Sequence, residues 1–123
     1  MIVSKFNNQS KILESKYSGE VTLAEVINNI ISIKENKIYP RDLKIKADAT
    51  NAIFKFSIAD LKLIDLESQK FSEKYSLIIE AIIVDNPKTT VFSMLYQDSK
   101  KNDKHKIKIF STDMIASMWL ENF

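Results

Sequence analysis

A chain of 123 residues with 45% hydrophobic and 28% charged residues has the size and composition of one globular domain. It contains no cysteine, which excludes disulfides, thiol nucleophiles and thiolate metal sites. Its formal net charge of +2 gives no electrostatic reason to expect nucleic acid as a partner. Its one glycine, Gly19, excludes glycine-rich phosphate loops of the GxGxxG and Walker types.

The chain shows no sign of a membrane segment or an export signal. No apolar run approaches the roughly 18 residues that a membrane span needs, so we expect no membrane insertion. The N-terminus lacks a signal-peptide pattern, and a bacterial-type cytoplasmic location is therefore expected. Of the 18 basic residues, Arg41 is the only arginine, although phosphate and carboxylate clamps usually use arginine forks.

The N-terminal part predicts two strands and then a helix. The strands are expected over 2–6 and 11–17, joined by a polar link short enough for an antiparallel hairpin. Thr22 then begins a helix that should end near Asn36, because Glu25 three residues later completes a capping box.

The middle of the chain predicts a strand, a loop and a second helix. Apolar and polar residues alternate over 43–49, which is typical of a strand. Residues 50–56 are expected to form a loop that tucks partly onto the core. Ser57 and Asp60 form a second capping box, which begins a helix reaching about Lys74.

The C-terminal part contains the clearest strand of the chain. The nearly unbroken apolar run over 77–84 is typical of a strand buried on both faces in a parallel sheet. Asn86 then caps a helix with Pro87 at its first position. A strand over 106–110 and a last helix capped by Ser111 complete the chain. That helix carries the following apolar residues: Ile115, Met118 and Trp119. The helix before it is expected to bury Val91, Phe92, Leu95 and Tyr96.

The predicted order is therefore β-β-α-β-α-β-α-β-α, which places the chain in the α/β class. Right-handed crossovers would give a mainly parallel five-stranded sheet with an antiparallel N-terminal strand and helices packed over it.

Three local patterns carry a resemblance that covers nearly the whole chain. They are YSGEVTLAEV (17–26), IIEAIIVDNPKTTVFSMLY (78–96) and IKIFSTDMIASMWL (107–120). Together with the order of elements, they resemble the SpoIIAA-like superfamily. That superfamily includes STAS domains and small STAS-like proteins of unknown function. The resemblance implies a single STAS-like domain over 1–123 that regulates through protein contacts and is not an enzyme.

The resemblance also indicates a position for phosphorylation. STAS regulators carry Asp-Ser-Ser-Gly where the third strand enters its helix, and a serine there is phosphorylated. This chain has IFKFSIAD at that position, with Ser57 alone and no glycine. Ser57 is therefore a candidate phosphorylation site, and the alternative is a plain helix cap. Thr89, at the start of the next helix, is a second candidate for contact with an anion.

Polar residues at the carboxyl ends of the strands are the candidate ligand pocket. Ligands of open α/β sheets bind at these ends, where the sequence places Asp48, Asp85, Asn86 and Ser111. Asp48 and Asp85 would form the carboxylate pair of a small enzyme, which is the less favoured alternative. Capping and turn formation explain the same residues without a ligand. No metal site or cofactor is expected.

The preferred hypothesis is a surface that binds another protein or a second copy of the chain. Its candidate residues are Phe54, Phe56, Leu63 and Leu66, on the second helix and the loop before it. An alternative is a pocket for a small apolar or lipid-like ligand, as in SEC14-like relatives. The aromatic and methionine side chains that would line it are Phe92, Met94, Tyr96, Met118 and Trp119.

Two further features are weighed and not assigned a function. His105 is the only histidine and has no matching catalytic motif nearby in the sequence, so we expect no catalytic role. The basic run of Lys100, Lys101, Lys104, Lys106 and Lys108 lacks the arginines and aromatics of a nucleic-acid site and is typical of a protected edge strand.

Overall fold

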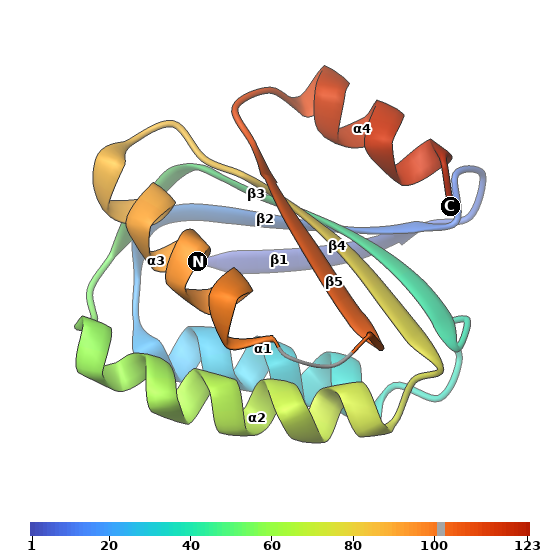
Figure 1. Ribbon diagram of the computed structural model, residues 1–123, viewed down its shortest axis with the longest axis horizontal. Coiled ribbons are helices and arrows are strands. Elements are labelled where there is room, and N and C mark those ends of the chain that lie inside the picture. The colour runs from blue at the N-terminus through green and yellow to red at the C-terminus, as the bar shows by residue number, and fades with distance from the viewer. Residues whose placement is uncertain (101–102) are drawn as a thin grey trace.

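The secondary structure follows the expected order, as Figure 1 shows for the computed structural model, which describes residues 1–100 and 103–123. The strands are β1 (Ile2–Asn7), β2 (Ile12–Val21), β3 (Asp42–Phe54), β4 (Leu77–Ile83) and β5 (His105–Phe110). The helices are α1 (Leu23–Glu35), α2 (Leu61–Glu73), α3 (Pro87–Ser99) and α4 (Asp113–Glu121), and a 3₁₀ turn (Ile58–Asp60) precedes α2. Lys101 of the predicted basic run lies outside the described residues.

The strands of the described residues form one sheet in the order β1-β2-β3-β4-β5. β1 pairs antiparallel with β2, and the remaining neighbours pair in parallel. This arrangement confirms the α/β prediction with its antiparallel N-terminal strand. β4 is buried on both faces, because Ile78 and Ile82 belong to one core cluster and Ile79 and Ile83 to the other.

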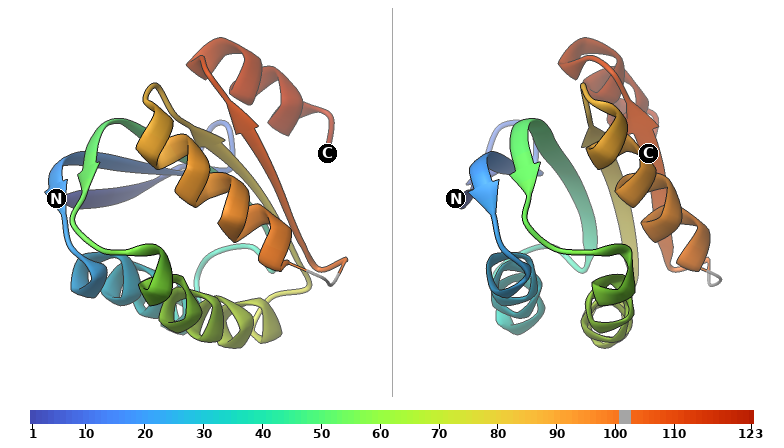
Figure 2. Two further views of the ribbon diagram at one scale, coloured as in Figure 1. Left: turned by 60° about the vertical axis from the view of Figure 1, so that its left-hand side comes forward. Right: turned by 90° about the vertical axis from the view of Figure 1, so that its left-hand side faces the viewer.

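The helices divide unequally between the two faces of the sheet. Figure 1 shows α1 and α2 below the sheet and α4 above it, and Figure 2 gives two further views of this arrangement. α3 belongs to the face of α1 and α2, because Phe92 shares the large core cluster with Val26 and Ile64. α4 covers β4 on the opposite face through Ala116 and Leu120. The larger core therefore lies between the sheet and helices α1–α3.

Two strands run further than the sequence predicted. The loop expected over 50–56 is wrong for most of its length, because β3 continues to Phe54 beside the extended end of β2. The alternation of buried and exposed side chains continues through Ala52 and Phe54, which keeps one face of the strand apolar. Gly19 lies in this part of β2 at φ +64°, a left-handed conformation that glycine adopts without strain.

Two of the predicted helix caps, those of α1 and α3, are present in the structure, and the one predicted for α4 is not. Thr22 and Glu25 form the predicted capping box of α1. Asn86 caps α3 by accepting a hydrogen bond from the Thr89 backbone N–H at 3.0 Å. The prediction that Ser111 caps the last helix is wrong. Its neighbour Thr112 takes that place, accepting from the Ile115 N–H at 3.4 Å.

The side chain of Arg41 links three segments of the fold through hydrogen bonds. The Arg41 guanidinium donates to the carbonyls of Tyr39, Asn36 and Lys74, which joins the end of α1, the start of β3 and the end of α2. It also lies 4.1 Å from the centre of the Tyr75 ring. A planar fork with several donors suits this position, and the single ammonium of a lysine does not.

Candidate functional site

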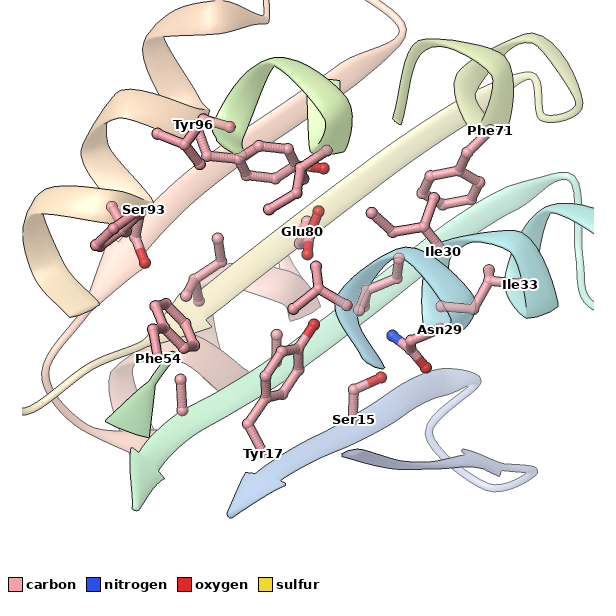
Figure 3. Close-up of a pocket in the computed structure, with 18 of the residues that line it drawn as sticks. Ser15, Tyr17, Asn29, Ile30, Ile33, Phe54, Phe71, Glu80, Ser93 and Tyr96 are labelled. Carbon is pink, nitrogen blue, oxygen red and sulfur yellow. The ribbon is translucent and has the colours of Figure 1, made fainter. Parts of the chain in front are cut away.

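A cavity of about 80 Å³ lies between the sheet and helices α1–α3 (Figure 3). Its floor is formed by small side chains on neighbouring strands, namely Ser15 of β2 with Ala47 and Ala49 of β3. Helices α1, α2 and α3 rest on larger residues around this floor. Because small side chains under a helix layer leave space that close packing would otherwise fill, the sequence of β2 and β3 creates the cavity.

Most of the cavity wall is apolar and rich in aromatic rings. Phe54, Phe56 and Phe92 form one group, in which neighbouring ring centres lie 4.9 to 5.8 Å apart. Phe71 of α2 lines another part of the wall. Apolar walls with a few polar groups inside are typical of small-molecule sites.

The polar groups of the cavity converge on one carboxylate. Glu80 of β4 lies at its centre, and the hydroxyl groups of Tyr17 and Tyr96 extend toward it from β2 and α3 (Figure 3). The hydroxyl groups of Tyr96 and Ser68 form a hydrogen bond, with their oxygens 2.7 Å apart. Asn29 of α1 also lines the cavity and accepts a hydrogen bond from Ser4 at 2.9 Å.

Glu80 is paired with the one histidine of the chain. Oε1 of Glu80 lies 2.8 Å from Nε2 of His105, a residue of β5 that pairs with Ile78, two residues before Glu80 on β4. The Glu80 side chain is 12% exposed and that of His105 is 0% exposed. Among the described residues, Nδ1 of His105 has no hydrogen-bond partner. Because a carboxylate oxygen accepts hydrogen bonds, Nε2 of His105 carries the N–H that donates in this contact.

The electrostatics of the cavity keep both phenols protonated. Burial raises the pKa of Tyr17, the negative charge of Glu80 raises it further, and a contact with Asn29 opposes the shift. Burial likewise raises the pKa of Tyr96 well above its usual value, and Glu80 adds to the effect. At neutral pH the cavity therefore presents two hydroxyl groups and a carboxyl group to a ligand.

The candidate pocket at the strand ends is not part of this cavity. Asp48 lies between the cavity residues Ala47 and Ala49, so its side chain points to the other face of the sheet. There it accepts hydrogen bonds from Thr50 and lies 3.5 Å from the Lys16 ammonium. Partial burial raises the pKa of Asp48, but these contacts outweigh it and leave the pKa lowered.

The other residues predicted for that pocket either contact neighbours in the chain or are exposed to solvent. Asp85 is exposed and accepts a hydrogen bond from the Asn86 side chain at 3.3 Å. Asn86 itself caps α3, and Ser111 is exposed in the connection between β5 and α4. The structure therefore does not bring the four predicted residues together around one pocket.

The residues predicted to form an interaction surface are partly buried and partly exposed in the structure. Phe54 and Phe56 are buried and line the cavity, so their assignment to the surface is wrong. They point inward because Phe54 continues the buried side of β3 and both rings pack on Phe92. Leu63 and Leu66 are exposed on α2, at 48% and 57%.

Of the residues predicted to line an apolar pocket, some line the cavity and others lie elsewhere. Phe92 and Tyr96 line the cavity. Trp119 packs on Phe110 on the opposite face of the sheet, while Met94 and Met118 are exposed.

Sequence reasoning did not single out the central residue, Glu80. The signal was present, because Glu80 is the one charged residue in the apolar run of residues 77–84. A charge in the middle of a strand buried on both faces requires a partner or a function.

Neither a metal-binding group nor a membrane-spanning helix is found in the described residues. In residues 1–100 and 103–123, no three histidine, aspartate or glutamate side chains form a group that could hold a metal ion. None of the helices in this part of the chain is long and apolar enough to cross a membrane.

The comparison with known proteins rests on structure. No protein-family model and no curated protein matches the chain. It is similar to the crystal structure of an uncharacterized protein of the DUF3478 family from Shewanella loihica PV-4, which has a SpoIIAA-like fold. The two share 16% sequence identity over 98% of this chain and 92% of the other, with a TM-score of 0.64. The chain has a SpoIIAA-like fold.

Within the SpoIIAA-like fold, the two candidate phosphorylation or anion sites differ in access. Ser57 is exposed, and its backbone N–H and hydroxyl both donate to the Asp60 carboxylate, at 2.9 and 3.2 Å. Thr89 is buried, and its hydroxyl donates to the Asn86 carbonyl. The assignment of Thr89 is therefore wrong, because its hydroxyl lies inside the first turn of α3. Ser57 stays a prediction.

Proposed function

We propose that this SpoIIAA-like domain binds a small molecule in the cavity beneath α1–α3 and is a non-enzymatic regulatory module of the bacterial cytoplasm. The observation that supports this most directly is that Tyr17, Glu80 and Tyr96 line one mostly apolar cavity. Apolar walls with a few convergent polar groups are typical of small-molecule sites. Glu80 and Tyr96 are each fixed by a partner, His105 and Ser68, and a carboxylate and a hydroxyl held in this way can orient a ligand.

Native mass spectrometry of the protein purified from its own host tests this proposal. The wild-type protein should carry an additional mass that is released on denaturation. Ala47→Leu should lose that mass, because the larger side chain occupies the floor of the cavity. Leu66→Ala is the matched control on the exposed face of α2 and should keep it. The proposal fails if the wild-type protein carries no additional mass, or if folded Ala47→Leu carries the same mass.

A second candidate function is capture of another protein, or of a second copy of the chain, through α2. Ile58, Leu63 and Leu66 are each about half exposed or more on the 3₁₀ turn and α2, and exposed apolar side chains are candidates for a contact surface. They would act as the contact surface of a regulator whose cavity senses the small molecule.

Charged substitutions test this surface directly. Leu63→Glu with Leu66→Glu should abolish partner capture or dimerisation, measured by pull-down and sedimentation, while cooperative thermal unfolding persists. Lys62→Glu, on the same helix, is the control for added negative charge. Unchanged capture and assembly in the leucine variant would remove α2 as the contact surface.

A further inference from the structure

The charge of the cavity restricts the class of molecule that the proposed function would bind. Oε1 of Glu80 receives the His105 N–H. The Glu80 side chain is 12% exposed and lines the cavity, so its carboxylate is open to a molecule inside the cavity. A ligand that brings a cationic donor would form a charge-assisted hydrogen bond with this carboxylate, which is stronger than a hydrogen bond between neutral groups.

Within the described residues, no cationic side chain lines the cavity. Of the described residues that line it, Glu80 is the one acidic side chain, and no lysine or arginine is among them. The nearby Lys100 ammonium, just after the end of α3, lies 3.5 Å from the Asp65 carboxylate and 4.5 Å from the centre of the Tyr96 ring. Its charge is therefore paired with a residue outside the lining.

Aromatic rings line the cavity together with the carboxylate. Phe54, Phe56 and Phe92 line it with Tyr17 and Tyr96. Aromatic rings accommodate the apolar body of an organic cation and can also attract its charge. A carboxylate ligand would instead meet the negative carboxylate of Glu80, with no cation among the described lining residues to offset it.

The volume of the cavity limits the size of the ligand that it can enclose. At about 80 Å³ it is smaller than an engineered apolar cavity of ~150 Å³ that admits benzene. It can enclose a short aliphatic group, but not the acyl chain of a lipid.

We infer that the cavity binds a small organic cation, an amine with a short apolar body, whose ammonium group contacts Glu80 and whose apolar part lies among the phenylalanine rings. This inference rests on the proposed function and specifies its ligand class. The inference also distinguishes this domain from a lipid carrier. The carboxylate of a fatty acid would meet the Glu80 carboxylate, and its acyl chain is too large for the cavity.

Titration calorimetry with three four-carbon probes, n-butylammonium, n-butanol and butyrate, tests the inference at pH 7. The wild-type protein should bind n-butylammonium about tenfold or more tightly than n-butanol, and butyrate more weakly than either. Glu80→Gln keeps the shape of the side chain and removes its charge, so it should bind amine and alcohol alike. Leu66→Ala, on the exposed side of α2 and outside the cavity lining, is the control and should retain the preference for the amine.

The outcomes separate this inference from the proposed function. If n-butanol or butyrate binds the wild-type protein as tightly as the amine, the ligand class is wrong while small-molecule binding stands. The ligand class is equally wrong if folded Glu80→Gln keeps the preference for the amine. If none of the three probes binds and the purified protein carries no additional mass, both proposals fail. The comparison of three probes on wild-type protein tests the ligand class even if a variant does not fold.

Discussion

Replacing His105 with leucine should lower the free energy of unfolding by about 3 kcal/mol, because it leaves the Glu80 carboxylate buried without its donor. Glu80→Leu should also destabilise the protein, since it leaves both nitrogens of a fully buried imidazole without a partner. The double variant should unfold at a free energy close to that of the wild-type protein or above it, because two leucines fill the space without any buried charge.

Urea denaturation of the four proteins gives the coupling between the two side chains. The two single losses should add to more than the loss in the double variant, by about 1 kcal/mol or more. The double variant should also lose its preference for an amine while remaining folded, which would show that the pair is retained for binding. Strictly additive losses would mean that the Glu80–His105 contact at 2.8 Å contributes nothing to folding.

Leu120→Ala should lower the free energy of unfolding by about 2–5 kcal/mol, the usual cost of removing a buried leucine. Leu120 is 0% exposed and belongs with Ala81, Ile83 and Ala116 to the core cluster on the α4 face of the sheet. This cluster is small, so the cavity left by the substitution has few neighbours that could move in to fill it.

Leu66→Ala is the matched control, because Leu66 is 57% exposed on α2. It should change the free energy of unfolding by less than about 0.5 kcal/mol. Chemical denaturation measures both variants, and amide hydrogen exchange should show faster opening of α4 in Leu120→Ala. Equal losses in the two leucine variants would contradict the division between core and surface described above.

The last helix shows how far a sequence pattern reaches. The sequence drew attention to its large apolar residues Ile115, Met118 and Trp119. In the structure Ala116 and Leu120 are the buried residues, Trp119 packs partly buried beside them, and Ile115 and Met118 are exposed. A short helix rich in apolar residues on several sides fits more than one orientation. The packing against β4 selects the side with the small alanine, which allows α4 to lie close to the sheet.

The third strand is a related case. A loop was predicted over residues 50–56, although Asn51 is the one residue of 50–54 that strongly favours a turn. The end of β2 pairs with this segment in parallel, and that pairing outweighs the local preference. Phe54 is thereby placed inside the cavity and not on the surface.

The sequence by itself determined the class and order of the fold, because caps, apolar periodicity and the long apolar strand depend on residues close together in the chain. It also excluded thiol chemistry and glycine-rich phosphate loops. The candidate site was decided only by the tertiary structure. Glu80, Tyr17, Tyr96 and His105 come from three strands and a helix, and they meet because neighbouring parallel strands and the helices above them bring distant residues to one face of the sheet. No local pattern encodes which side chains meet across such a layer.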